Sequence, residues 1–237
     1  MQTQDVKLGF FAAPEIGPCP GVVLIHDVWG LTDHARDLAQ RLSGEGFAVL
    51  ALDLYRRLDE VKIDNPGEWM RALSDPQILA DVQAGADFLA AHSITKGQRI
   101  GVIGFCMGGM YALMAGASCT GLSASVPFYG LLSHQHGILH SESPDQTLKP
   151  NEPLEVARDL RCPALAFYGD EDEFVPVSDI ELLKERFAQS PRSAEVVIYP
   201  GAGHAFMNDT RPDAYRPDDA ANAWQRMVAF LTEQLNR

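Results

Sequence analysis

The sequence predicts an α/β fold in which a mostly parallel central sheet carries helices on both faces. Short apolar runs alternate with longer stretches whose apolar residues recur at helical spacing. The runs are apolar throughout, as expected of strands that are buried on both faces. Such alternation favours parallel strands joined by crossover helices. The chain shows no linker, long repeat or low-complexity tract, so residues 1–237 are expected to form a single domain.

Six apolar runs are predicted to be the strands of this sheet. They are GVVLIH (21–26), FAVLALDL (47–54), RIGVIGF (99–105), ASVPFYG (124–130), PALAFYG (163–169) and AEVVIYPG (194–201). Residues 56–74 are charged and irregular, and the polar, proline-bearing segment between the fourth and fifth runs is expected to be a loop.

Helices are predicted between the strands and at the C-terminus. One has Asp75 as its cap and Pro76 at its first position. Ser178 and Glu181 predict a capping box at the start of another. A further helix directly follows Cys106. The C-terminal helix presents an apolar face made of Ala220, Trp224, Met227, Val228 and Leu231.

Charge and composition disfavour several classes of function. The formal net charge is −13, from 19 basic and 32 acidic side chains, which disfavours binding to nucleic acid or to an anionic membrane surface. The segment MQTQDVKLGFF lacks the pattern of a signal peptide, and no apolar run approaches the ~18 residues of a membrane helix. The four cysteines indicate neither a disulfide framework nor a zinc site. We therefore expect a cytoplasmic protein that acts on a small molecule, as a monomer or small homo-oligomer.

Residues able to carry chemistry gather directly after the predicted strands. In open α/β sheets, functional residues lie just beyond the carboxyl ends of the strands. The residues in these positions are His26, Asp27, Trp29, Asp53, Tyr55, Arg56, Arg57, Cys106, Asp170, Asp172, Phe174, His204 and Asn208.

The turn GFCMGG places Cys106 at its apex, where the G-x-S-x-G pattern has a serine. A thiol is mostly protonated at neutral pH, so a nucleophilic cysteine needs a base, here His204, and an acid that orients the base, here Asp172. An oxyanion would need two backbone N–H groups, which we assign to Met107 and Val28. The start of the following helix also favours a thiolate.

Each of these three residues has a simpler interpretation when it is taken alone. Cys106 can be a small packed residue, His204 can stabilise a loop, and Asp172 can be a turn or cap residue. Their joint occurrence favours an active site, because the order of nucleophile, acid and histidine is that of α/β-hydrolases and each follows a predicted strand.

The remaining histidines and cysteines are assigned no catalytic role. No metal site is expected, because the loop with His134, His136 and His140 has no carboxylate or cysteine at ligand spacing. His34 and His92 are predicted to be exposed on helices. The other thiols are predicted to be buried or incidental, and they are Cys19, Cys119 and Cys162.

The sequence resembles the dienelactone hydrolase family of α/β-hydrolases. The blocks that carry the resemblance are LIHDVWGLTDHARDLAQRLSGEGFAVLALDLY, IGVIGFCMGG, YGDEDEFVPV and PGAGHAFMND, and the match covers nearly the whole chain. The resemblance implies the α/β-hydrolase fold and hydrolysis of esters or lactones by Cys106, His204 and Asp172, without a cofactor. It also implies that Asp27 pairs with the resting thiol and moves away when substrate binds.

The chain departs from the family type at positions that would hold the substrate. Asp27 replaces a glutamate, and Asn208 replaces an arginine that binds the substrate carboxylate. Lys62 and Trp69 lie near the spacing of a second arginine and a tryptophan, but Pro66 replaces the tyrosine between them. These departures predict a weaker preference for anionic lactones and good turnover of neutral aryl esters.

The residues predicted to bind substrate are Trp29, Tyr55, Arg57, Lys62, Trp69, Phe174 and Asn208. A substrate carboxylate, if present, would depend on Arg57, Lys62 or Arg211. Two other functions stay open at this point. A thioesterase or acyltransferase would use the same triad with a different substrate or acceptor, and a non-catalytic ligand-binding homologue would keep only the fold.

Overall fold

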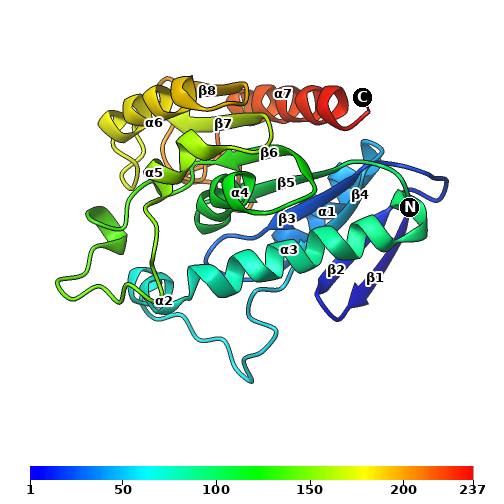
Figure 1. Ribbon diagram of the computed structural model, residues 1–237, viewed down its shortest axis with the longest axis horizontal. Helices are drawn as coiled ribbons and strands as arrows, with labels where there is room; N and C mark the ends of the chain where they lie inside the picture. Colours follow the sequence, from blue (N-terminus) through cyan, green and yellow to red (C-terminus); the bar gives the residue numbers. More distant parts are fainter. Residues whose placement is uncertain (237) are drawn as a thin grey trace.

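The computed structural model describes residues 1–236, in which eight strands form one sheet (Figure 1). The strand order is β1-β2-β4-β3-β5-β6-β7-β8. All pairs from β4 to β8 are parallel, whereas β1 pairs antiparallel with β2, and β2 with β4. The six predicted strands are confirmed as β3 (Gly21–Ile25), β4 (Ala48–Leu52), β5 (Ile100–Phe105), β6 (Leu122–Phe128), β7 (Ala164–Gly169) and β8 (Ala194–Tyr199).

An N-terminal hairpin extends the sheet and was not predicted. It consists of β1 (Gln2–Val6) and β2 (Gly9–Ala13). β1 is mostly exposed and polar, because it is the edge strand and packs on only one neighbour. β2 is fully buried between β1 and β4, so its short apolar run is the signal that could have revealed the hairpin.

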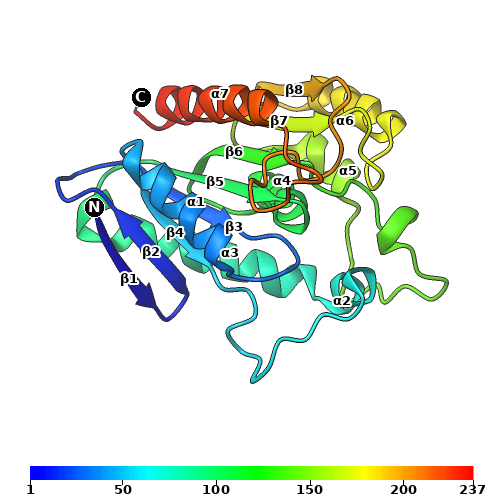
Figure 2. The same ribbon diagram turned by 180° about the vertical axis from the view of Figure 1, so that it is seen from behind.

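Two helical layers cover the sheet. α1 (Asp33–Gly44) and α7 (Pro217–Leu235) pack on one face, whereas α3 (Asp75–Ala91), α4 (Met107–Ser118) and α6 (Val177–Gln189) pack on the other. Figure 2 shows α1 in front of the sheet, and Figure 1 shows α3 and α4 in front of the opposite face. The strands that carry the predicted site therefore lie between two apolar layers. The shorter helical elements are α2 (Pro66–Ala72), α5 (Pro153–Val156), η1 (Ser93–Thr95), η2 (Gly137–Leu139) and η3 (Ala157–Asp159).

Three local predictions about helices were wrong. Residues 56–74 contain α2, whose N-cap Asn65 accepts a hydrogen bond from the Glu68 N–H before a proline at the helix start. The cap of α3 is Ser74, not Asp75, because the Ser74 hydroxyl accepts the Gln77 N–H. The capping box predicted for α6 does not form. Its N-cap residue makes no side-chain cap bond, and the carboxylate of Glu181 instead pairs with a lysine in the next turn.

Asp75 holds the segment between β6 and β7 against the helices. Its carboxylate accepts hydrogen bonds from the Tyr111 hydroxyl (2.7 Å) and the Lys149 ammonium (2.6 Å). The Asp75 N–H also donates to the Leu148 carbonyl. The side chains of Asp75 and Lys149 are only 1% and 8% exposed, so water could not replace either charged partner if the other were removed.

Among residues 1–236, the helices are too short or too polar to cross a membrane.

Lys149→Met should lower the free energy of unfolding by about 3–5 kcal/mol, because the Asp75 carboxylate would stay buried without its cation. Urea denaturation measures this change. The matched control is Lys184→Met, which removes an exposed ion pair with Glu181 and should cost less than about 1 kcal/mol. Equal effects of the two substitutions would contradict the interpretation.

Candidate active site

The carboxyl ends of the parallel strands surround a small cavity with a volume of about 40 Å³. β3, β5 and β6 end at this cavity, and the loops after β7 and β8 bring Asp172 and His204 to the same edge. Such a volume is enough for one or two water molecules. The residues lining it include Asp27, Trp29, His34, Cys106, Tyr129, His204, Asn208 and Arg211.

Cys106 lies in a sharp turn between β5 and α4. Its φ of 55° and ψ of −119° place a non-glycine residue in a region that costs about 1–3 kcal/mol. Two hydrogen bonds hold this conformation, one from the Cys106 N–H to the Phe128 carbonyl and one from the Met110 N–H to the Cys106 carbonyl. The turn is close enough that a Cβ on Gly104 would lie 2.0 Å from the Gly108 carbonyl oxygen. The GFCMGG segment thus folds as its glycines predict.

His204 is oriented by Asp172. The His204 Nδ1 lies 2.8 Å from Asp172 Oδ2, and because a carboxylate only accepts, Nδ1 carries the proton. The other carboxylate oxygen accepts the backbone N–H groups of Phe174 and Val175. The ring of His204 also packs edge-on against Tyr129 and Phe174. Its Nε2 therefore remains for the thiol.

The charges at Cys106 and Asp172 decide the protonation of His204. Burial alone lowers the pKa of His204, but the negative charge of a Cys106 thiolate and the hydrogen bond to Asp172 offset this and raise the pKa to about 10. The Nε2 atom is buried and makes no hydrogen bond of normal geometry to any residue within 1–236. The arrangement can hold an imidazolium next to a thiolate.

The two predicted oxyanion donors lie on either side of a close backbone contact. Met107 opens α4, so its N–H has no partner within the helix. Val28 lies in the turn after β3. A Cβ on Gly108 would lie 2.3 Å from the Ile25 carbonyl oxygen and 2.5 Å from that of His26, so the start of α4 touches the end of β3. Only glycine permits this approach.

Asp27 lines the cavity together with Cys106, but the pairing expected between them is not present in this structure. The Asp27 carboxylate accepts the Trp29 N–H at 2.9 Å. Within residues 1–236, it makes no hydrogen bond to the thiol. The base next to Cys106 in this conformation is His204.

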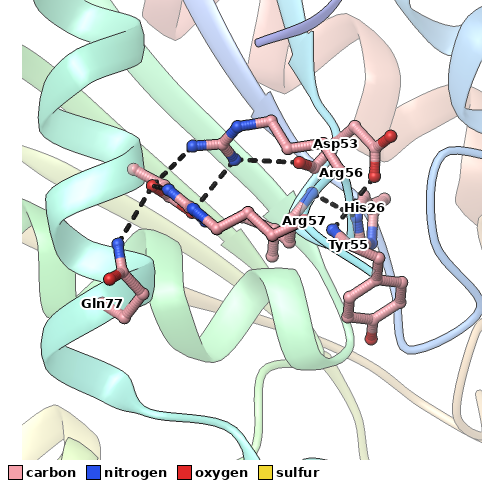
Figure 3. A network of polar contacts seen from close by, with 8 residues as sticks. His26, Asp53, Tyr55, Arg56, Arg57 and Gln77 are labelled. Carbon is pink, nitrogen blue, oxygen red and sulfur yellow. Dashed lines mark hydrogen bonds and ion pairs between the residues drawn. The ribbon is translucent and has the colours of Figure 1, made fainter. Parts of the chain in front are cut away.

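Arg57 and Lys62 lie outside the cavity, contrary to their predicted contact with substrate. Arg57 donates to both oxygens of Asp81, at 2.7 and 2.5 Å. Figure 3 shows Arg56 and Arg57 extending toward Gln77, away from the ring of Tyr55. Lys62 is 73% exposed and pairs only loosely with a neighbouring aspartate. Asp81 therefore pairs with Arg57, the arginine that was predicted to contact substrate, and also with Arg56.

Some of the aromatic residues predicted to bind substrate line the cavity or pack on His204, whereas others pack behind the turn at Val28. Trp29 lines the cavity, and Phe174 packs on the His204 ring. Tyr55 is buried, and its hydroxyl donates to the Val28 carbonyl at 2.8 Å. Trp69 packs edge-on against Tyr55, with 5.4 Å between ring centroids. Tyr55 and Trp69 thus support the turn at Val28 rather than line the cavity.

The structure adds residues that the sequence did not point to. Tyr129 directly follows β6 and contacts His204, whereas the sequence placed it inside the predicted strand 124–130. His34 was predicted to be exposed, but its side chain is 13% exposed and lines the cavity. Its Nδ1 lies 3.4 Å from Asp209. No sequence signal indicated that partner.

The other predicted histidines have separate neighbours. His134 lies beside Asp75 and His136 beside Asp179, whereas His140 bonds to a backbone carbonyl. Within residues 1–236, no group of three or more possible ligands is placed to hold a metal ion. His92, predicted to be exposed, packs against Phe11.

Comparisons with known proteins agree on one family. A model described as the dienelactone hydrolase family matches residues 8–235. A Bradyrhizobium protein provisionally named 2-oxo-3-(5-oxofuran-2-ylidene)propanoate lactonase is 34% identical over 231 residues, covering 96% of this chain and 89% of the relative. A Methylorubrum extorquens protein provisionally named carboxymethylenebutenolidase is 32% identical over 224 residues, covering 92% and 74%. The crystal structure of a provisionally assigned dienelactone hydrolase from Klebsiella pneumoniae subsp. pneumoniae has a TM-score of 0.81 at 31% identity, covering 93% of this chain and 90% of that one.

Cys106→Ala should lower the pKa of His204 from about 10 toward the ordinary value near ~6.5, because it removes the largest contribution that raises it. The direction of this pKa change can be tested at pH 8, where His204 should be protonated in the unmodified protein and neutral in the variant. NMR titration of the imidazole carbon-bound protons measures this, with His204→Gln to assign the signal. An unchanged titration would show that the thiol does not control this histidine.

Proposed function

Because this chain belongs to the dienelactone hydrolase family and has the α/β-hydrolase fold, we propose that it hydrolyses carboxylic esters or lactones through a Cys106–His204–Asp172 triad. The observation that carries the proposal is the joint geometry at one cavity. A strained cysteine lies at a helix start, a histidine is held in one tautomer by a buried carboxylate, and both line the same cavity.

In the proposed acylation step, the Cys106 thiolate attacks the acyl carbon and the carbonyl oxygen becomes an oxyanion. The N–H groups of Met107 and Val28 stabilise that charge. His204 then gives its Nε2 proton to the leaving oxygen, so that the C–O bond breaks and an acyl thioester remains. Asp172 keeps Nδ1 protonated and stabilises the imidazolium.

In the proposed deacylation step, His204 acts in the opposite sense. Neutral His204 takes a proton from water, and the resulting hydroxide attacks the thioester. Collapse of the second tetrahedral adduct breaks the C–S bond and restores the Cys106 thiolate beside His204, which keeps the proton taken from water. The carboxylic acid loses its own proton to solvent and leaves as its anion. No redox change or external co-reactant is needed.

The substrate class follows from the names of the relatives and from the cavity wall. Relatives that share about a third of their sequence with this chain carry the names of lactone hydrolases, so we place lactones among its substrates. Of the three basic candidates, Arg211 lines the cavity. Its side chain is 46% exposed and its guanidinium pairs with Asp213 at 3.2 Å, so it can turn to a substrate carboxylate at modest cost.

Limiting iodoacetamide should label Cys106 first and abolish ester hydrolysis in proportion. Cys106 is partly exposed, whereas the other three thiols are buried. Burial raises the pKa of Cys19, that of Cys119 to about 11 and that of Cys162 to about 12, which keeps these thiols protonated. Peptide mass spectrometry measures labelling, and a panel of activated esters, lactones and anilides measures activity.

Cys106→Ser is the matched variant for this experiment. It should keep the far-UV circular dichroism spectrum and lose most activity on the panel, because a hydroxyl is a much weaker nucleophile beside the same histidine. Activity loss through labelling of another cysteine, or full activity in the serine variant, would refute the proposed triad.

Arg211→Gln should lower kcat/KM for a carboxylated lactone by about 10- to 100-fold, the range of one hydrogen bond to a charged group. Turnover of a neutral aryl ester should change by less than about 3-fold, since that substrate offers no carboxylate. Lys62→Gln is the matched control, because it removes one positive charge at a position that is 73% exposed. Equal losses on both substrates would argue against recognition of a carboxylate by Arg211.

A further inference from the structure

We propose that His26 and Tyr55 are positioning residues that hold the turn Asp27–Val28–Trp29 so that the Val28 N–H serves as an oxyanion donor. This inference rests on the proposed acyl chemistry at Cys106. Neither residue was assigned this role from the sequence, where Tyr55 was expected to bind substrate. Both side chains are buried behind the turn, and Figure 3 shows them next to each other, with 5.1 Å between their ring centroids.

His26 makes two hydrogen bonds that fix its tautomer. Its Nδ1 lies 2.5 Å from the Asp27 carbonyl oxygen, which can only accept, so Nδ1 must donate. Its Nε2 lies 3.2 Å from the Leu54 backbone N, which can only donate, so Nε2 must accept. His26 is therefore neutral and satisfied at both nitrogens. It ties the turn after β3 to the turn after β4.

The bond to the Asp27 carbonyl sets the direction of the Val28 N–H. The two groups belong to one trans peptide unit, in which C=O and N–H point in opposite directions. Holding the carbonyl toward His26 therefore turns the N–H away from it. The Gly30 N–H supports the same carbonyl at 3.3 Å. Within residues 1–236, the Val28 N–H donates to no acceptor, so it is free for a substrate oxygen.

Tyr55 fixes the next peptide unit in the same way. Its hydroxyl donates to the Val28 carbonyl at 2.8 Å, which turns the Trp29 N–H to the opposite side. There the Trp29 N–H binds the Asp27 carboxylate at 2.9 Å. The Tyr55 hydroxyl also lies 3.6 Å from the Met107 sulfur, on the residue that supplies the other proposed oxyanion donor. Consecutive carbonyls of one turn are thus held by two buried side chains.

The test compares His26→Phe, His26→Gln and Tyr55→Phe on an activated ester. His26→Phe removes both hydrogen bonds and should lower kcat about 10- to 100-fold with KM changed less than about 3-fold, since a misplaced donor stabilises only the transition state. His26→Gln keeps one donor and one acceptor on a planar amide and should recover most of that loss. Tyr55→Phe deletes a single hydroxyl and should lower kcat by about 5- to 20-fold.

Alkylation of Cys106 by iodoacetamide distinguishes a misplaced oxyanion donor from general damage to the active site. The thiolate displaces iodide in this reaction, and no oxyanion forms. The rate of alkylation should stay within about 2-fold of the unmodified protein in all three variants. Alkylation slowed in step with kcat would overturn the proposal, as would an undiminished kcat in His26→Phe. If His26→Phe does not fold, the same two measurements on Tyr55→Phe, the kcat on the ester and the rate of Cys106 alkylation, test the proposal. An unmodified protein that cleaves neither an ester nor a lactone on the panel would instead refute the proposed function itself.

Discussion

The close contact between the start of α4 and the end of β3 is the constraint on which the site depends. Gly108 lies so near the Ile25 and His26 carbonyls that any Cβ would have to displace backbone atoms. A similar contact joins Gly109 to the Phe128 carbonyl on β6. Side chains at these two positions would push the helix away from the sheet. The elbow would then lose its contact with the turn that carries Val28.

The same contact explains how Cys106 keeps a strained backbone. A residue at φ 55° and ψ −119° persists only if its surroundings compensate for the cost. Here the compensation comes from hydrogen bonds at both ends of the residue and from the following helix, which is buried from Met107 to Ala117. Tyr129 and Ala205 also have positive φ values and also line the cavity. Strain is therefore concentrated where side chains must be presented at the sheet edge.

The sequence predicted the parts of this molecule that are encoded locally. Cys106, Asp172 and His204 each follow an apolar run, so the rule that strand ends meet at one edge of a sheet was enough to bring them together. Contacts between distant segments were out of reach. Arg57 was assigned to a substrate because nothing in its surroundings pointed to Asp81, and His34 was taken as exposed because Asp209 lies far along the chain. The helix at Asn65 was missed although an Asn-Pro start is a local signal.

The electrostatics of the site indicate why a cysteine suits activated acyl groups. A histidine with a raised pKa beside the thiol favours the ion pair, and a thiolate is both a good nucleophile and a good leaving group. The first tetrahedral adduct can therefore expel the thiolate and return to substrate. Forward collapse competes only when the other leaving group departs readily, as an aryl or enol oxygen does, whereas an amide nitrogen must first be protonated. The proposed triad thus selects by leaving group, while the oxyanion donors accelerate attack on any acyl carbon that reaches them.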